Sequence, residues 1–167
     1  MFRFHTFAFA VAATLAACST PARDSRPTVE ARDDFGAPIA LGRSPRRIVS
    51  LNPTTTELLF AIGASNRLVG RSQWDVFPDS AVAIPSVGQA LRPNVEAIVN
   101  VRPDLVLLYA SEDNRPAFDR LRQAGIATVA LKIDSIAQFE RDTRLIGRIT
   151  GDSVRADALV DSVHATL

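Results

Sequence analysis

The sequence has a single cysteine, Cys18, and a net charge of only +1 over 167 residues. One cysteine excludes a disulfide within the chain and a zinc site of the multi-cysteine type. A nearly neutral charge provides no electrostatic footprint for nucleic acid or for an anionic membrane surface. The hydrophobic content of 47% and the charged content of 22% are typical of a globular protein that is stabilised by packing.

Long apolar runs are also missing, since the longest extends from Phe7 to Ala17 and is broken by Thr14. This run is roughly half as long as a membrane-spanning helix needs to be. Arg3 precedes the run and small residues follow it, which predicts a secretory signal peptide over residues 1–17. We therefore expect the chain to be exported.

Familiar catalytic and nucleotide-binding motifs are absent, because the sequence has no Gly-x-Gly-x-x-Gly, no Walker loop and no Gly-x-Ser-x-Gly. His164 is the only histidine after the expected signal peptide, and Cys18 is expected to carry a lipid, so no cysteine and histidine pair remains as a nucleophile and base. Asp104 and Glu112 near a strand end are the remaining acid pair. These features favour a protein that is not an enzyme, with a doubly wound α/β enzyme as the alternative.

Residues 18–45 contain four prolines among serine, arginine and aspartate, with little periodicity. This composition predicts a tether between the signal peptide and the folded part. Residues 35–39 would allow a turn and a short edge strand at the end of the tether.

From Arg47 onward, short apolar runs alternate with helical patterns, which predicts βαβ units around a mostly parallel sheet. The expected strands are Ile48–Leu51, Leu68–Val69, Leu105–Leu108 and Ile126–Leu131. Helices are expected between and after them, from capping residues and apolar stripes. The residues that place these helices are Thr54 with Glu57, Asn94, Pro116 with Gly125, and Ser135 with Gln138.

Asp152 or Ser153 begins a last helix that has no stop signal. From the residues alone, this segment is either a natural C-terminal helix or the start of a longer one.

Three stretches of the chain resemble one known family, in the order RIVSLNPTTTELLFAIGA, LVGRSQWDVFP and SVGQALRPNVEAIVNVRPDLVLLY. They are similar to the N-terminal lobe of periplasmic substrate-binding proteins for cobalamin, haem and iron-siderophores, which serve ATP-driven importers. The resemblance covers about residues 46–167. It implies a Rossmann-like α/β substrate-binding lobe over residues 46–151, followed at 152–167 by the start of a long interlobe helix, with the C-terminal lobe absent from this chain.

The resemblance also implies a function without a resident cofactor. Such a protein captures cobalamin or a ferric siderophore between two lobes and delivers it to an importer permease, with haem as the alternative ligand. Ala90 falls where cobalamin-binding members carry a tryptophan, so one stacking surface for cobalamin is missing.

Trp74 and Tyr109 are the candidates for an aromatic ligand platform, because flat side chains offer contact area with little rotamer entropy to lose. Each follows a predicted strand, at the carboxyl edge where open α/β sheets place ligands. The resemblance puts both on the cleft. The alternative is that Trp74 packs its own loop and Tyr109 caps the core.

Two further groups are candidate ligand contacts. Asn52, Pro53 and Thr54 join the first strand to the first helix and would present backbone amides to a polar ligand, or else serve only as a helix cap. Arg71 and Arg92 flank the cleft loops and would pair with ligand carboxylates or phosphates, or else lie in solvent.

Two residues are candidates for contacts beyond the ligand. The resemblance gives Glu96 the role of the lobe-surface glutamate that docks onto permease arginines; the alternative is that it only stabilises the helix start through the helix dipole. The LAAC sequence ending at Cys18 resembles the lipobox of bacterial lipoproteins, so Cys18 is expected to carry the lipid that anchors the exported protein to the bacterial membrane, facing the periplasm or cell exterior. An incidental cysteine, and a structural lipoprotein without a small ligand, are the alternatives.

Overall fold

Four parallel strands form the centre of the fold, in a computed structural model that describes residues 31–166. They are β1 (Ile48–Ser50), β2 (Leu68–Arg71), β3 (Leu105–Tyr109) and β4 (Ala127–Leu131). The strand order is β2-β1-β3-β4 and every neighbouring pair is parallel. The predicted α/β class with a parallel sheet is confirmed. The expected signal peptide and Cys18 lie outside the described residues.

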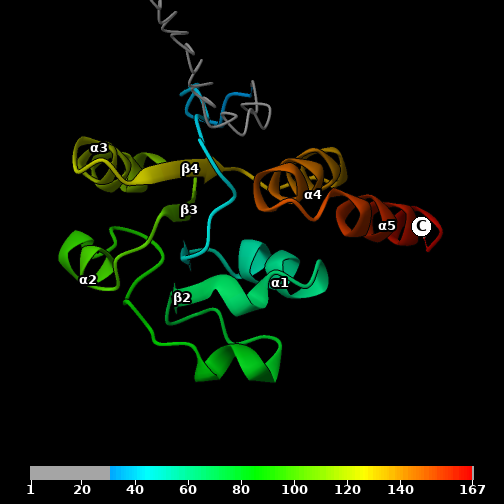
Figure 1. Ribbon diagram of the computed structural model, residues 1–167, viewed down its shortest axis with the longest axis horizontal. Coiled ribbons are helices and arrows are strands. Elements are labelled where there is room, and N and C mark those ends of the chain that lie inside the picture. Colours follow the sequence, from blue (N-terminus) through cyan, green and yellow to red (C-terminus); the bar gives the residue numbers. More distant parts are fainter. Residues whose placement is uncertain (1–30, 167) are drawn as a thin grey trace, which may run out of the picture.

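Helices cover both faces of the sheet (Figure 1). Side chains alternate between the faces along each strand, so in β3 Leu105 and Leu107 point to one hydrophobic cluster and Val106 and Leu108 to the other. The first cluster is covered by α1, α4 and α5, and the second by α2 and α3. The bounds are α1 Pro53–Ala61, α2 Val95–Asn100, α3 Arg115–Gln123, α4 Ile136–Thr150 and α5 Ser153–His164.

Helix α1 begins earlier than predicted. The side chain of Asn52 accepts a hydrogen bond from the Thr54 amide at 3.0 Å, and Pro53 is the first helical residue. Proline suits that position because its fixed φ is helical and its missing N–H would have had no partner. The predicted capping box of Thr54 and Glu57 is therefore wrong, since both residues lie inside the helix.

Asn94 and Ser135 cap their helices as predicted, whereas Asp152 precedes α5 without a capping bond from its side chain. The Asn94 side chain accepts a hydrogen bond from the Ala97 amide, and the Ser135 side chain accepts one from the Gln138 amide. Gly151 ends α4 in the left-handed conformation that glycine adopts without strain. Helix α5 then packs closely on α4, because a Cβ at Gly147 would meet the backbone of Ser153 at 3.2 Å.

Residues 31–41 pack on the lobe and are not part of a free tether. Asp33 is buried, and its carboxylate accepts hydrogen bonds from the Ala37 amide at 2.8 Å and from the Ala130 amide of β4 at 3.2 Å. Ile39 is 5% exposed and belongs to the first hydrophobic cluster. The expected tether therefore does not extend to residue 45.

The turn expected at residues 35–39 is present, but it closes an isolated bridge between Arg32 and Pro38 and not a full edge strand. Gly36 occupies the turn with a φ of 77°, in the left-handed region that favours glycine. Among residues 31–166, no helix has the length and apolar character that crossing a membrane requires.

Candidate functional site

The carboxyl edge of the sheet has a topological switch point between β1 and β3. After β1 the chain forms β2 on one side of it, and then forms β3 on the other. Open α/β sheets bind ligands outside the carboxyl ends of their strands at such a point. Residues 52–54 follow β1 and Tyr109 is the last residue of β3, so these predicted contacts flank the switch point.

Trp74 lies in the loop that follows β2, and 62% of it is exposed. Val76, Phe77 and Val82 in the same loop are also more than half exposed. An indole this exposed does not pack into the hydrophobic core, and most of its surface is not covered by its own loop either. The loop thus presents an apolar surface beside the carboxyl edge.

Trp74 and Tyr109 do not stack on each other within the described part of the chain. Strand β1 separates β2 from β3, so two strand spacings, about 10 Å, lie between the strands that carry them. The two side chains therefore come from the ends of strands that are not neighbours in the sheet.

Tyr109 is half-buried, and its hydroxyl donates to Asp134, with 2.9 Å to each carboxylate oxygen. Burial, followed by the hydrogen bond and the negative charge of Asp134, raises the pKa of the phenol above its usual 10. Asp134 follows β4, so this contact joins the carboxyl ends of two strands. Sequence reasoning missed Asp134, because its only signal was its place after a predicted strand.

An apolar hollow of about 460 Å³ lies beside this pair. Thr54 of α1 and Asp134 both contribute to its wall, together with Ile136 and Phe139 of α4. Ile136 is 52% exposed, so the hollow continues into open apolar surface. The predicted contact at Thr54 is therefore next to the partner of Tyr109.

Arg71 is buried, so the alternative that it lies in solvent is wrong. Its Nε donates to the Ala81 carbonyl at 2.9 Å, and its two terminal nitrogens donate to the carbonyls of Ser72 and Val82. These bonds hold the shape of the loop that carries Trp74. The Arg71 guanidinium is thus occupied by backbone carbonyls of its own loop, and a ligand contact at Arg71 stays a prediction.

Arg92 is exposed and pairs with Asp113, with 2.8 Å between its terminal nitrogen and a carboxylate oxygen. Beside it, Asn114 is fully buried and was missed from the sequence. Its amide nitrogen donates to the carbonyls of Ala90 and Tyr109, and its oxygen accepts from the Arg92 amide. Asn114 thus fixes the end of β3 against the loop before α2.

Glu96 is exposed in the first turn of α2, while Ile98 faces the core. Val99 is 40% exposed. Residues three apart in a helix share a face, so Val99 lies beside Glu96 and not opposite to it. Glu96 and Val99 thus form part of the exposed face of α2.

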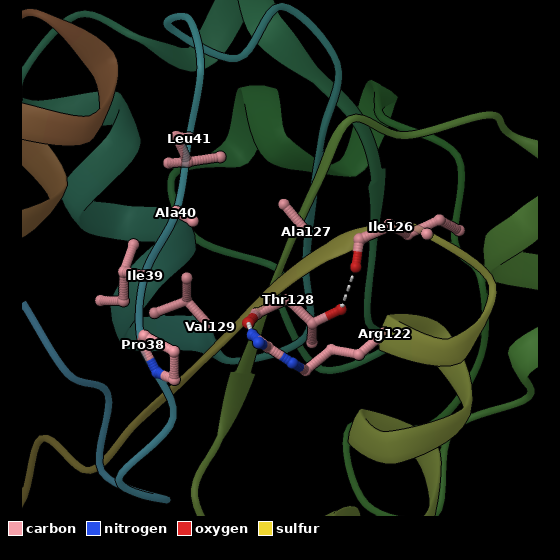
Figure 2. Close-up of a pocket in the computed structure, with 10 residues that line it drawn as sticks. Pro38, Ile39, Ala40, Leu41, Arg122, Ile126, Ala127, Thr128 and Val129 are labelled. Carbon is pink, nitrogen blue, oxygen red and sulfur yellow. Dashed lines mark hydrogen bonds between the residues drawn. The ribbon is translucent and has the colours of Figure 1, made fainter. Parts of the chain in front are cut away.

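A second hollow lies elsewhere, between residues 38–41 and the outer edge of β4 (Figure 2). Its volume is about 210 Å³, and Arg122 donates across it to the Thr128 carbonyl at 3.4 Å. It adjoins the amino-terminal half of β4, away from the carboxyl edge, and contains none of the predicted ligand residues.

Comparison with known proteins decides the family. The family model for periplasmic binding proteins matches residues 48–167. The chain belongs to the periplasmic binding protein family. The match includes all four strands and the residues that flank the switch point.

Similar proteins support this assignment. An uncharacterized ABC transporter substrate-binding lipoprotein of Bacillus subtilis is 30% identical over 168 residues, which cover 93% of this chain and 53% of that protein. A cobalamin-binding protein of Halobacterium salinarum is 34% identical over 148 residues, covering 85% of this chain and 37% of that protein. The solved haem-binding protein of Roseiflexus sp. RS-1 is 28% identical, with a TM-score of 0.66 over 72% of this chain and 46% of that chain.

The chain spans about half or less of the length of these proteins. Each of the three is named for binding or transport and not for catalysis.

Proposed function

We propose that this chain forms the amino-terminal lobe of an exported substrate-binding protein, which captures a cobalamin or a ferric siderophore for an ABC importer. The observation that carries the proposal is the exposed indole of Trp74 beside the carboxyl edge of an all-parallel sheet, where a binding protein of this family needs a ligand surface. Trp74 and Tyr109 are the proposed platform. Residues 52–54 and Arg92 are the proposed polar contacts.

The spacing of the two strand ends supports a large ligand. Strand β2, whose following loop carries Trp74, and β3, which ends at Tyr109, lie two strand spacings apart, about 10 Å, and a span of that order suits a corrinoid or a metal chelate better than an amino acid or a simple sugar. The 34% identity to a cobalamin-binding protein supports the corrinoid, whereas the half-buried Ala90 offers no aromatic ring.

Haem is the second candidate ligand, supported by the likeness to a haem-binding structure. A tyrosine that coordinates haem iron does so as the phenolate. The raised pKa of Tyr109 and its hydrogen bond to Asp134 both favour the neutral phenol. Haem binding through a Tyr109 to iron bond is therefore the less favoured arrangement.

The relatives suggest how the lobe is used. The matched region is about half of the Bacillus protein, and we propose that a second lobe encloses the other side of the ligand, with α5 leading toward it. Exposed Glu96 is the proposed contact with the permease. Cys18 is the proposed lipid attachment site; an intact mass of the membrane-bound chain without two acyl groups would reject that assignment.

Ligand titration tests the proposal. Trp74 is the only tryptophan, so the emission of the full-length protein reports on the proposed platform. Cyanocobalamin, a ferric hydroxamate siderophore and haemin are each titrated in, with N-acetyltryptophanamide as the control for light absorbed by the ligand. We expect saturable quenching beyond the control by one ligand class. Quenching no greater than the control for all three would contradict the proposed ligand surface.

A further inference from the structure

The loop that carries Trp74 has an unusual arrangement of polarity. Trp74 and Val76 are 62% and 56% exposed, whereas Asp75 between them is 0% exposed. A buried carboxylate is unfavourable unless hydrogen bonds satisfy it. The loop therefore places its apolar side chains in solvent and its charge inside.

Hydrogen bonds account for the buried charge. One carboxylate oxygen of Asp75 accepts from the Ser72 hydroxyl at 2.5 Å, and the other accepts from the Thr56 hydroxyl at 2.7 Å and from the Ser72 amide at 3.3 Å. Both hydroxyl groups belong to buried residues. Burial is the main influence on Asp75 and raises its pKa, while these bonds and the nearby charge of Arg71 act in the opposite direction.

These bonds connect Trp74 to helix α1. The Trp74 amide donates to the Ser72 hydroxyl at 3.2 Å, which in turn donates to Asp75, and Asp75 is held by Thr56. Thr56 lies one turn into α1, just after residues 52–54. The chain of bonds thus fixes the backbone at Trp74 relative to the helix start that is the other proposed ligand contact.

We infer that Asp75, held by Thr56 and Ser72, is a positioning residue that orders the Trp74 loop before ligand binds. A loop ordered in advance does not lose that freedom on binding, so the exposed indole contributes its full contact energy. The expected effect on ligand binding rests on the proposed function. The hydrogen bonds that connect the Trp74 backbone to Asp75 through Ser72 do not depend on any ligand.

The mobility of Trp74 tests the inference without ligand. Fluorescence anisotropy and acrylamide quenching of the single tryptophan are compared in the wild type, Asp75→Ala, Asp75→Asn and Thr56→Val. We expect Asp75→Ala to lower the anisotropy toward the unfolded value and to increase quenching, because nanosecond loop motion is released. Asp75→Asn keeps the shape and one acceptor oxygen, and its amide nitrogen can donate to the Ser72 hydroxyl in place of the bond that the carboxylate accepted, so it should restore most of the wild-type values.

Asp142→Ala is the matched control. Asp142 is also a fully buried carboxylate, but it lies in α4 and is held by Arg141. We expect this variant to lose stability and leave the anisotropy of folded Trp74 unchanged. Equal anisotropy in Asp75→Ala and wild type, or an equal fall in Asp142→Ala, would overturn the inference. If Asp75→Ala does not fold, Thr56→Val takes its place in the anisotropy comparison, and anisotropy equal to that of the wild type would overturn the inference.

Ligand affinity separates this inference from the proposed function. For whichever of cyanocobalamin, ferric hydroxamate or haemin binds the wild type, we expect the Kd of Asp75→Ala to rise about tenfold. Mobile Trp74 with unchanged affinity would overturn the positioning role. No binding by the wild type would contradict the proposed function, while the anisotropy result would still decide whether Asp75 holds the loop.

Discussion

The phenol oxygen of Tyr109 lies 2.9 Å from each carboxylate oxygen of Asp134, and this contact joins the carboxyl ends of β3 and β4. Thr54 borders the same hollow as Asp134, so the pair lies beside the start of α1. The edge of the sheet is thereby braced beside the switch point between β1 and β3, the kind of position at which open α/β sheets bind ligands.

Replacing Asp134 should lower the pKa of Tyr109. Asp134→Asn removes the negative charge that, together with burial, raises this pKa, so the phenol should titrate closer to 10. Tyr109 is the only tyrosine, which makes phenolate absorbance a single-site measurement. Asp113→Asn, at an exposed carboxylate paired with Arg92, is the control. Identical titration midpoints for Asp134→Asn and wild type would contradict the account.

Asp75 should make stability depend on pH in mild acid. Its folded-state pKa is raised above the unfolded value of 3.8, so its stabilising contribution is complete below 3.8 and is lost as pH rises through the folded pKa. The unfolding free energy of the wild type, minus that of Asp75→Asn, should therefore fall as pH increases over this range. Urea unfolding at a series of pH values measures this difference. A difference that is constant or rises with pH would contradict a raised pKa of Asp75, because the hydrogen bonds and the charge of Arg71 would then match or outweigh the effect of burial.

Ile39→Ala tests whether residues 31–41 belong to the fold. Ile39 is 5% exposed, and truncating such a side chain to alanine costs about 2–5 kcal/mol. Val154→Ala is the control, because Val154 is 85% exposed and its loss should change stability by less than about 0.5 kcal/mol. Both values come from urea unfolding. If Ile39→Ala were as mild as Val154→Ala, the segment would be a tether after all.

Most of the fold was predictable from local sequence, because its signals act over a few residues. The four aliphatic residues at Leu105–Leu108 predicted a buried strand, which the structure contains as β3. Asn94 and Ser135 cap their helices as expected. The start of α1 was misplaced although Asn52-Pro53 is itself a capping signal. The strand order was not predictable, since it depends on pairings between residues far apart in the chain.

The candidate site was predictable only in part. Aromatic residues after strands gave Trp74 and Tyr109, whose exposure and place agree with a ligand surface. The residues that hold them were missed, because charged and amide side chains are usually exposed and only tertiary contacts bury them. Asp75 and Asn114 are of this kind, and the burial of Arg71, which was named from the sequence, was missed for the same reason.

Glu96→Arg should abolish uptake and leave ligand affinity unchanged. Reversing this exposed charge would place like charges together at the proposed permease contact, which costs several kcal/mol. Glu57→Arg is the matched control, at an exposed glutamate on α1. Uptake of labelled ligand by cells and calorimetric affinity are measured for both. Normal uptake by Glu96→Arg would refute docking, and weakened affinity would place Glu96 in the ligand surface.

The affinity of Trp74→Ala for ligand tests the central claim most directly. For the ligand class that binds the full-length wild-type protein, calorimetry should show binding weakened about tenfold or more, since a flat aromatic contact contributes about 1 kcal/mol beyond the area it buries. The unfolding free energy should change little, in contrast to the buried Phe118, whose truncation to alanine should cost about 3–5 kcal/mol. Unchanged affinity in Trp74→Ala, or a loss of stability as large as that of Phe118→Ala, would contradict the assignment of Trp74 to a ligand surface.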